Sequence, residues 1–121
     1  MTASNINLGR WGEDHAVEFL IVKGYRIIKR NFRNKLGEID IIAQDLNGVI
    51  CFIEVKTRLS LDKGFPFESV DSRKQEKLRK LALSFLKFWY QTCEIKSRFE
   101  VMSIIRLPNG QADIKHIVNA F

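Results

Sequence analysis

The stretch GEIDIIAQDLNGVICFIEVKTR, residues 37–58, decides the fold that we expect for this chain. Its two apolar runs, residues 38–44 and 49–57, are rich in Ile, Val and Phe, which is typical of buried β-strands. The segment between them ends in Asn47-Gly48, a pair that favours the positive φ angles of a hairpin turn. The stretch therefore predicts two neighbouring antiparallel strands.

Charged residues interrupt both of these strands. Glu54 and Lys56 are two residues apart, so they point to the same face of their strand, while Val55 points the other way. Asp40 lies in the middle of the partner strand, and a short register offset would bring it beside Glu54. A Glu-x-Lys pair alone is common as a surface ion pair, so the pair by itself is weak evidence for a site.

A third acid is expected from the helix that precedes the strands. Residues 7–23 have a helical pattern, and Glu13 lies on the apolar stripe. Gly9 and Gly12 weaken its first turns, which predicts that another backbone or a ligand approaches closely there. Charged residues from three separate elements thus favour a functional site over unrelated surface ion pairs.

Carboxylates that meet at one point need a positive partner, because like charges repel and an unpaired buried carboxylate is costly. Oxygen ligands suit Mg²⁺, which takes one or two carboxylates together with phosphate oxygens. We therefore expect Asp40, Glu54 and Glu13 to bind Mg²⁺, for which Mn²⁺ can substitute. Lys56 would orient or deprotonate the attacking water, or stabilise the transition-state charge. Glu38 shares the parity of Asp40 but starts its strand, so we expect a solvated turn residue there.

The rest of the chain predicts a second helix and three further strands. The helix at residues 72–91 opens with SRKQ, a capping-box pattern, and Lys74 and Gln75 extend its apolar stripe to the N-terminus. Strands are expected at residues 25–31, 98–106 and 112–118, and a loop at residues 58–72. For Glu68, on this loop, the sequence leaves two alternatives: a surface residue of the loop, or a residue at the edge of the site. The order predicts one α/β domain, residues 1–121, with a mixed sheet packed by helices.

The charge distribution predicts a polyanionic partner. The chain carries a net charge of +6. Arg26, Lys29, Arg30 and Arg33 fall in a run without any acid, and a second basic group begins at residue 73. No apolar run approaches the length of a membrane span and no secretory signal opens the chain, so we expect a cytoplasmic protein without membrane contact. The two cysteines, Cys51 and Cys93, are expected to be free thiols, with Cys51 in the core. His15 and His116 have no partner pattern and are not assigned to the site.

Several stretches resemble one known family. They are GRWGEDHAVEFLIVKGYRIIKRNFRNKLGEIDIIAQD, CFIEVKTR, SVDSRKQEKLRKLALSFL and HIVNAF, which together run over nearly the whole chain. They resemble the YraN-like family of small bacterial proteins. That family is grouped with the restriction-endonuclease-like, PD-(D/E)xK superfamily, near the archaeal Holliday junction resolvases.

The resemblance implies a three-layer core with a mixed sheet between helices and a Mg²⁺-dependent nuclease site. By position, Asp40 matches the aspartate of the first motif strand, Glu54 and Lys56 match the (D/E)xK element, and Glu13 matches the acid of the first helix. Gln75, and after it Lys74, matches the polar position in the helix that follows. Glu100 stands where relatives usually have aspartate, and we expect a charged role at a strand edge.

Two functions from different classes stay open at this point. The leading hypothesis is an Mg²⁺-dependent endonuclease that hydrolyses phosphodiester bonds in DNA, with branched, flapped or single-stranded DNA as candidate substrates. Asp40, Glu54, Lys56 and Gln75 would be its catalytic residues. The alternative is a nucleic-acid-binding module with a vestigial nuclease site, in which Arg26, Lys29, Arg30, Arg33 and Lys74 bind phosphates. A protein-interaction domain that meets an acidic partner is a third reading, and a homodimer is left open.

Overall fold

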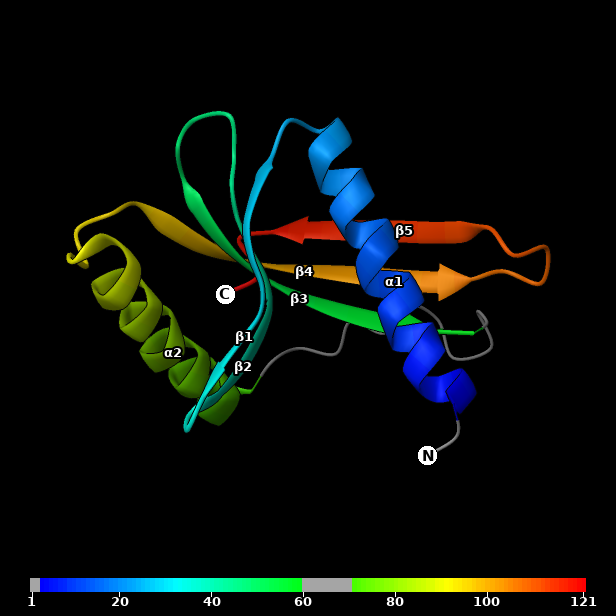
Figure 1. Cartoon of the computed structure of the whole chain (residues 1–121), viewed down its shortest axis with the longest axis horizontal. Helices are drawn as coiled ribbons and strands as arrows, with labels where there is room; N and C mark the ends of the chain where they lie inside the picture. Colours follow the sequence, from blue (N-terminus) through cyan, green and yellow to red (C-terminus); the bar gives the residue numbers. More distant parts are fainter. Residues whose placement is uncertain (1–2, 60–70) are drawn as a thin grey trace.

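The structure is a computed structural model that describes residues 3–59 and 71–121 (Figure 1). Along the chain, the helices and strands are α1 (Ala3–Val22), β1 (Arg26–Asn34), β2 (Gly37–Gln44), β3 (Ile50–Arg58), α2 (Ser72–Tyr90), β4 (Ser97–Arg106) and β5 (Ala112–Val118). Every expected element is present, and the largest differences are an earlier start of α1 and a longer β1. Most of the expected loop, including Glu68, lies outside the described residues.

The described strands form one mixed sheet in the order β1-β2-β3-β4-β5. Neighbouring strands are antiparallel except for β3 and β4, which are parallel. A parallel pair needs a long crossover connection, and α2 lies in the connection between these two strands. The expected turn between β2 and β3 forms with Gly48 at a φ of 84°.

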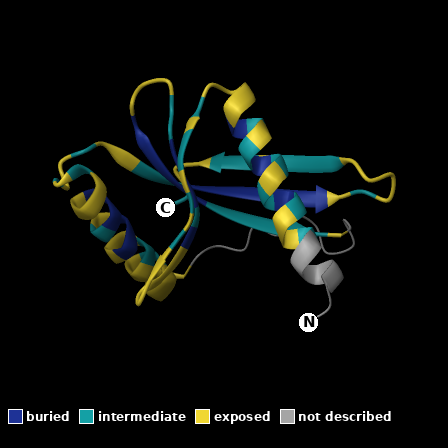
Figure 2. Cartoon of the chain, in the orientation of Figure 1, coloured by how far each residue is buried: buried dark blue, intermediate teal, exposed yellow. Residues whose placement is uncertain are grey.

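The two helices cover opposite faces of the sheet, which gives the molecule three layers (Figure 1). α1 packs on a core cluster that contains Leu20 and Ile53, and α2 packs on a second cluster that contains Phe52 and Phe85. Ile53 and Phe52 belong to different clusters because successive side chains of a strand point to opposite faces. Figure 2 shows that the buried residues concentrate in the central strands and on the inner side of α2. The expected α/β core, with a mixed sheet between helices, is confirmed.

The two ends of α2 are fixed by different contacts. The helix starts at Ser72 as expected, but its N-cap is Asp71, whose side chain accepts a hydrogen bond from the Lys74 N–H at 2.8 Å. The capping box headed by Ser72 was therefore wrong by one position. At the other end, Gln91 adopts a left-handed φ of 61° and its N–H bonds to the Lys87 carbonyl.

A close contact between α1 and β3 confirms the expectation for Gly12. A Cβ at this position would lie 2.0 Å from the Thr57 hydroxyl oxygen, so a larger residue would push the helix away from the strand. Glu13, the next residue, is held close to the charged strands for this reason. At Gly9 a Cβ would meet nothing within 4 Å among the described residues, so no other backbone approaches there, and the expected approach of a ligand stays a prediction.

Both cysteines have the state that the sequence predicts. Cys51 is a free, buried thiol and Cys93 is a free, exposed one. Among the helices in the described part of the chain, none combines the length and the apolar character needed to cross a membrane.

A buried polar cluster joins the sheet to the start of β1. Glu100 is buried in β4, so the role expected for it at a strand edge was wrong. Its carboxylate accepts hydrogen bonds from Arg98 Nε at 2.7 Å and the Tyr25 hydroxyl at 3.0 Å, and His116 Nε2 lies 2.5 Å away. Arg98 also pairs with Asp45 at 2.7 Å. Burial alone raises the pKa of Glu100, but the bonds to His116 and Arg98 outweigh it, so the net pKa is lowered.

Glu100→Ala is expected to reduce the free energy of unfolding at pH 7 by about 3–5 kcal/mol, because Arg98, Tyr25 and His116 lose the buried carboxylate that they share. The lowered pKa means that wild-type Glu100 contributes stability above its unfolded-state pKa, and that this contribution is lost as the pH falls through the folded-state pKa. Urea denaturation at several pH values measures both effects. The exposed Glu94→Ala is the matched control, and an equal, small effect of both variants would contradict the prediction.

Candidate functional site

The candidate site lies where β2 and β3 separate. Their backbone pairing runs from Gln44 and Ile50 to Ile41 and Ile53, and does not continue beyond that point. The Val55 N–H instead donates a hydrogen bond of 2.8 Å to Asp40 Oδ2. A carboxylate thus takes the place of a strand partner, because a backbone N–H away from water needs an acceptor. This bond fixes the Asp40 side chain in the gap between the strands.

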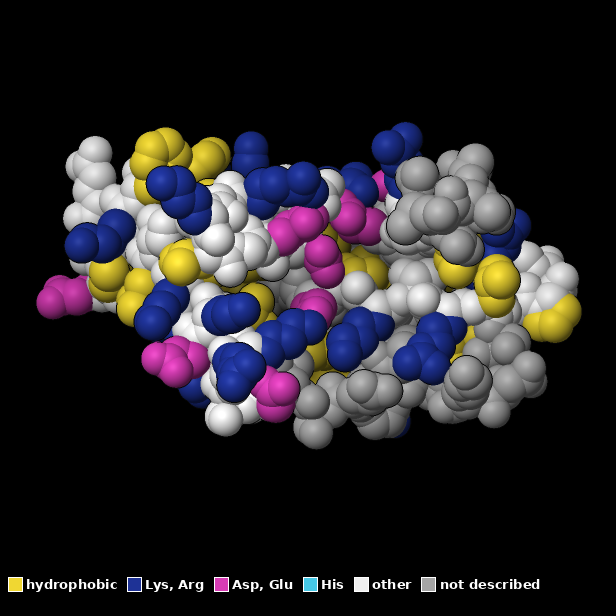
Figure 3. Space-filling view, turned by 90° about the horizontal axis from the view of Figure 1, so that it is seen from below, with side chains coloured by type: hydrophobic (Ala, Val, Ile, Leu, Met, Phe, Trp, Pro, Cys, Tyr) yellow, Lys and Arg dark blue, Asp and Glu magenta, His cyan; other side chains and the backbone are white. Residues whose placement is uncertain are grey.

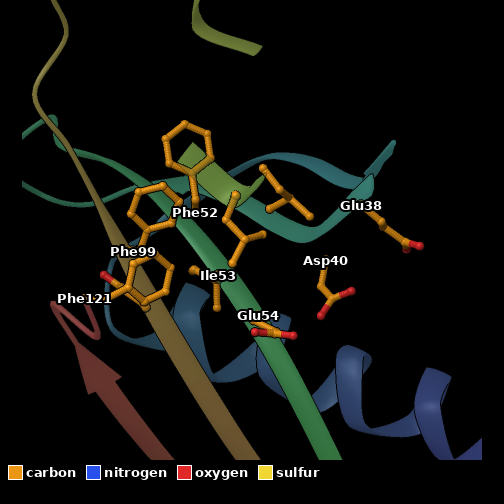
Figure 4. A pocket seen from close by; sticks show the side chains of 10 residues that line it. Glu38, Asp40, Phe52, Ile53, Glu54, Phe99 and Phe121 are labelled. Atoms are coloured by element: carbon orange, nitrogen blue, oxygen red, sulfur yellow. The ribbon is translucent and has the colours of Figure 1, made fainter. Parts of the chain in front are cut away.

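Asp40 and Glu54 line one small cavity, of about 50 Å³, together with Glu38. Figure 4 shows the three carboxylates on one side of this cavity and the phenyl rings of Phe52 and Phe99 on the other. The expected meeting of acids from β2 and β3 is therefore present. The rings limit the water that can screen these charges.

Burial and neighbouring charge act together on Asp40. Burial is the largest effect, and together with the nearby charges of Glu54, Glu13 and Glu38 it raises the pKa of Asp40 to about 6. The hydrogen bond from Val55 favours the charged form and opposes the shift, but it is outweighed. Asp40 therefore occupies a position in which an added cation would stabilise its charged form.

The described residues give a hydrogen-bond partner to only one of the two carboxylate oxygens of Glu54. Its Oε1 accepts from Lys74 Nζ at 2.6 Å, in an ion pair between β3 and the first turn of α2. Its Oε2 is buried, and the described residues offer it no hydrogen-bond partner. A buried carboxylate oxygen without a donor is costly, so this atom is available to a cation.

Lys56 follows Glu54 on the same face of β3 and is half-buried. Within the described residues, its ammonium has no hydrogen-bond or ion-pair partner. Lys56 does not line the cavity shared by Asp40 and Glu54, so its placement on the same face of β3 as Glu54 is what relates it to the site.

Glu13 borders the site, and one of its two carboxylate oxygens is already bonded to β1. It lines a second cavity, of about 410 Å³, together with Asp40 and Glu38. Its Oε1 accepts from Arg30 Nε at 2.8 Å and from Asn31 Nδ2 at 3.2 Å. In residues 3–59 and 71–121, no three or more Asp, Glu, His or Cys side chains form a group that could hold a metal ion. The described site therefore brings together two carboxylates, Asp40 and Glu54, rather than the three that the sequence predicts.

The two helix residues expected at the site differ in position. Lys74 reaches Glu54, as described, but Gln75 does not line the cavity shared by Asp40 and Glu54 among the described residues. The Gln75 side chain oxygen instead lies 3.5 Å from an Arg79 guanidinium nitrogen. Of the two, Lys74 is the one in direct contact with a site carboxylate.

The basic residues expected to bind nucleic acid are partly neutralised. Arg30 pairs with Glu13 and with Asp14, at 2.8 and 2.7 Å, and Arg33 pairs with Glu38 at 3.1 Å. Arg26 donates to the side chain of Gln44 at 2.8 Å. Lys29 is exposed, and the described residues give it no such partner. Figure 3 shows acidic side chains gathered in a hollow between groups of Lys and Arg.

Glu38 is the site residue that the sequence interpretation left out. It lines both cavities that contain Asp40, and its charge contributes to the raised pKa of that residue. Glu38 is two residues from Asp40 on the same strand, and this spacing was the signal that could have identified it. The position at the start of β2 does not make it a free turn residue, because Arg33 on β1 holds its carboxylate.

The donor set fits one hard divalent cation. The orphaned Oε2 of Glu54 and the Asp40 oxygen that Val55 does not bind are both carboxylate oxygens at the same cavity. Mg²⁺ is bound by proteins through one or two carboxylates, with waters and substrate phosphates as further ligands. The geometry is therefore suited to a cation that is only partly bound by the protein.

Sequence comparisons give one consistent family. A sequence model of the family described as "Uncharacterised protein family UPF0102" matches residues 12–104. The chain is 47% identical over 120 residues to a "UPF0102 protein" of Prosthecochloris aestuarii. The match covers 95% of this chain and 93% of that protein. It is 42% identical over 117 residues to a "UPF0102 protein" of Trichlorobacter lovleyi, and this match covers 97% of this chain and 91% of that protein.

Solved structures show more distant similarity. One is a crystal structure of a repair endonuclease from Pyrococcus abyssi, at a TM-score of 0.44 and 18% identity, and the match covers 84% of this chain but 39% of that one. Another is the structure of an EndoMS–double-stranded DNA complex, at a TM-score of 0.40 and 17% identity. This match covers 73% of this chain and 34% of that one. The chain thus spans well under half the length of either protein.

Asp40→Asn is expected to stabilise the protein above pH 6, by about 2 kcal/mol at pH 8, because it removes a carboxylate that burial disfavours and keeps an oxygen for Val55. A carboxyl with a raised folded-state pKa costs stability above that pKa, so the advantage of the variant shrinks as the pH falls below about 6 and is lost below the unfolded-state value, near 4. Urea denaturation between pH 4 and pH 8 checks this, with Glu94→Gln as the exposed control. A pH-independent difference would contradict the prediction.

Proposed function

The chain belongs to the UPF0102 family, and from its site we propose that it is a metal-dependent endonuclease that hydrolyses phosphodiester bonds in DNA. The family expected from the sequence, there named YraN-like, is thereby confirmed. One observation carries the proposal: Asp40 and Glu54 share a cavity, and a buried oxygen of the Glu54 carboxylate has no hydrogen-bond partner among the described residues. A purely structural ion-pair cluster would have satisfied that oxygen.

Asp40 and Glu54 would hold the cation, with Mg²⁺ as the expected ion and Mn²⁺ as a substitute. When bound, such an ion supplies charge neutralisation at the scissile phosphate and lowers the pKa of a water. Glu13 and Glu38 add negative charge at the edge of the site, where they would favour cation binding without needing to contact the ion.

The chain's own residues would position the reactants. Lys56, on the same face of β3 as Glu54, would orient the attacking water or stabilise the charge on a non-bridging phosphate oxygen. A role for Gln75 rests on the family resemblance, and its contact with Arg79 means that it would have to turn toward the cavity.

Phosphates outside the reacting group would contact the basic residues around the acidic hollow. Lys29, Arg26 and Lys74 are exposed, whereas Arg30 and Arg33 would first have to exchange an intramolecular acid for a phosphate. The net charge of +6 would draw the polyanion to this surface. We take DNA, branched or single-stranded, as the substrate class, and include in the proposal a single domain over residues 1–121 and a cytoplasmic location. A homodimer would suit symmetric cleavage of a branched substrate.

Purified protein with Mg²⁺ or Mn²⁺ is expected to cut branched, flapped or single-stranded DNA, and EDTA is expected to stop the reaction. Glu54→Gln and Lys56→Met should each lower the cleavage rate by about 10²-fold or more, because each removes charge that acts on the reacting phosphate. Gel assays of labelled substrates measure the rates. Glu94→Gln, at an exposed site far from the cavity in sequence, is the control, and equal cleavage by all variants would indicate a contaminating nuclease.

A nucleic-acid-binding module with a vestigial site is the second candidate. Two observations favour it: Lys74 already neutralises one oxygen of Glu54, and Arg30 neutralises Glu13. A module of this kind would bind DNA without any metal.

For the binding module, DNA affinity in EDTA should fall steeply as salt rises, because bound phosphates release counterions. Lys29→Ala should weaken binding to all sequences and reduce the slope of log K against log salt by about 1. Fluorescence anisotropy at several salt concentrations measures this, with Lys96→Ala, at an exposed position just before β4, as a control. Metal-dependent cleavage would argue against this candidate, and salt-insensitive or absent binding would exclude it.

A further inference from the structure

The ion pair between Lys74 and Glu54 has an unusual position for a lysine. Lys74 is the third residue of α2, and the first turn of this helix contains no acid. The positive end of the helix dipole disfavours a cation there, and acids are the residues that usually fill these positions. The ammonium nevertheless extends to β3 and contacts Glu54 Oε1 at 2.6 Å. A cation is therefore held next to the site carboxylates at a position where local helix energetics oppose it.

Asp71 fixes the backbone from which Lys74 extends. Its side chain accepts from the Lys74 N–H at 2.8 Å, and its carbonyl accepts from the Gln75 N–H at 2.9 Å. The base of the lysine side chain is thus anchored, while its end is free to turn: the side chain is 46% exposed, against 23% for Glu54. A half-exposed ion pair of this kind contributes little net energy, so it can be broken at low cost.

The ammonium occupies the place of an external cation at one oxygen of Glu54 and leaves the other empty. Oε2 of Glu54 is buried without a hydrogen-bond partner in the described part of the chain, so the pair with Lys74 neutralises the carboxylate incompletely. A divalent ion bound at Oε2 would lie within a few ångströms of the ammonium, and two like charges at that separation repel strongly. Metal binding and the ion pair therefore exclude or weaken each other.

We propose that Lys74 is an internal counter-ion that competes with the divalent cation for Glu54 and that is released to a substrate phosphate when the cation binds. This inference rests on the proposed function and adds a coupling to it. Because the released ammonium gains a phosphate partner, metal and DNA bind more tightly together than apart. Each ligand strengthens the other by the same factor, as linkage requires.

The competing charge also has a function when no ligand is present. It keeps Glu54 from facing Asp40 with two uncompensated carboxylates in one cavity, which would destabilise the folded chain. The consequence is a low metal affinity in the absence of DNA. The site therefore binds a cation mainly when a substrate is bound.

Calorimetric titration with Mn²⁺ tests the proposal, with and without a short single-stranded DNA, on chains that carry Lys56→Met so that cleavage is slow during the titration. Without DNA, Lys74→Met should bind Mn²⁺ about fivefold more tightly than the parent, the factor that corresponds to the loss of a competing ion pair. Lys74→Arg keeps the charge and should match the parent within about twofold. DNA should tighten Mn²⁺ binding in the parent, and this gain should be smaller in Lys74→Met.

Lys77→Met is the matched control, because Lys77 lies one turn further along α2, is exposed and lines the same surface cavity as Lys74. It should change Mn²⁺ affinity by less than about twofold, since it alters the net charge equally without touching Glu54. Circular dichroism melts establish that each variant is folded. Equal Mn²⁺ affinity of the Lys74→Met and Lys77→Met chains would overturn the inference and leave the proposed nuclease intact, whereas absence of Mn²⁺ binding by every variant would overturn the metal site itself.

Discussion

Where β2 and β3 separate, the Val55 N–H has no strand partner and is bonded to the carboxylate of Asp40. The same contact does two things. It satisfies a backbone donor at the end of the strand pairing, and it holds a negative charge in a cavity that Glu54 enters from the next strand. Because one side chain serves both purposes, the position of the site follows from the point at which the hairpin opens. The raised pKa of Asp40 is the energetic consequence of that arrangement.

Two glutamates at neighbouring levels of the sheet show how differently a fold can treat a charge. Glu100, beside Ile53 on the face covered by α1, is bonded to Arg98, Tyr25 and His116 and has a lowered pKa. Glu54, one residue further along β3 on the opposite face, keeps an oxygen without any donor. The carboxylate of Glu100 holds strands together, whereas the carboxylate of Glu54 keeps one oxygen that can still accept a ligand. The difference lies in the number of donors around each carboxylate, and both residues are shielded from water.

The sequence predicts the elements and the pair of acids because both depend on short-range rules. Alternation along β3 and the length of the turn to β2 are enough to bring Asp40 near Glu54. The contact between Lys74 and Glu54 depends on where the crossover delivers α2, and no local pattern contains that information. The neutralisation of Glu13 by Arg30 and the burial of Glu100 were missed for the same reason, since their partners come from other elements. Glu38 alone could have been recognised, because it shares the parity of Asp40.

The bonds of Glu100 also determine when folding can finish. Its partners are Tyr25, 75 residues earlier, and His116 on β5, the last strand of the sheet. Contacts between such distant parts of a chain form slowly, because a large loop must close before they add any stability. A nascent chain that has left the ribosome only as far as β4 would carry Glu100 and Arg98 without the imidazole that completes their cluster. The buried cluster around Glu100 is therefore complete only after β5 has been synthesised.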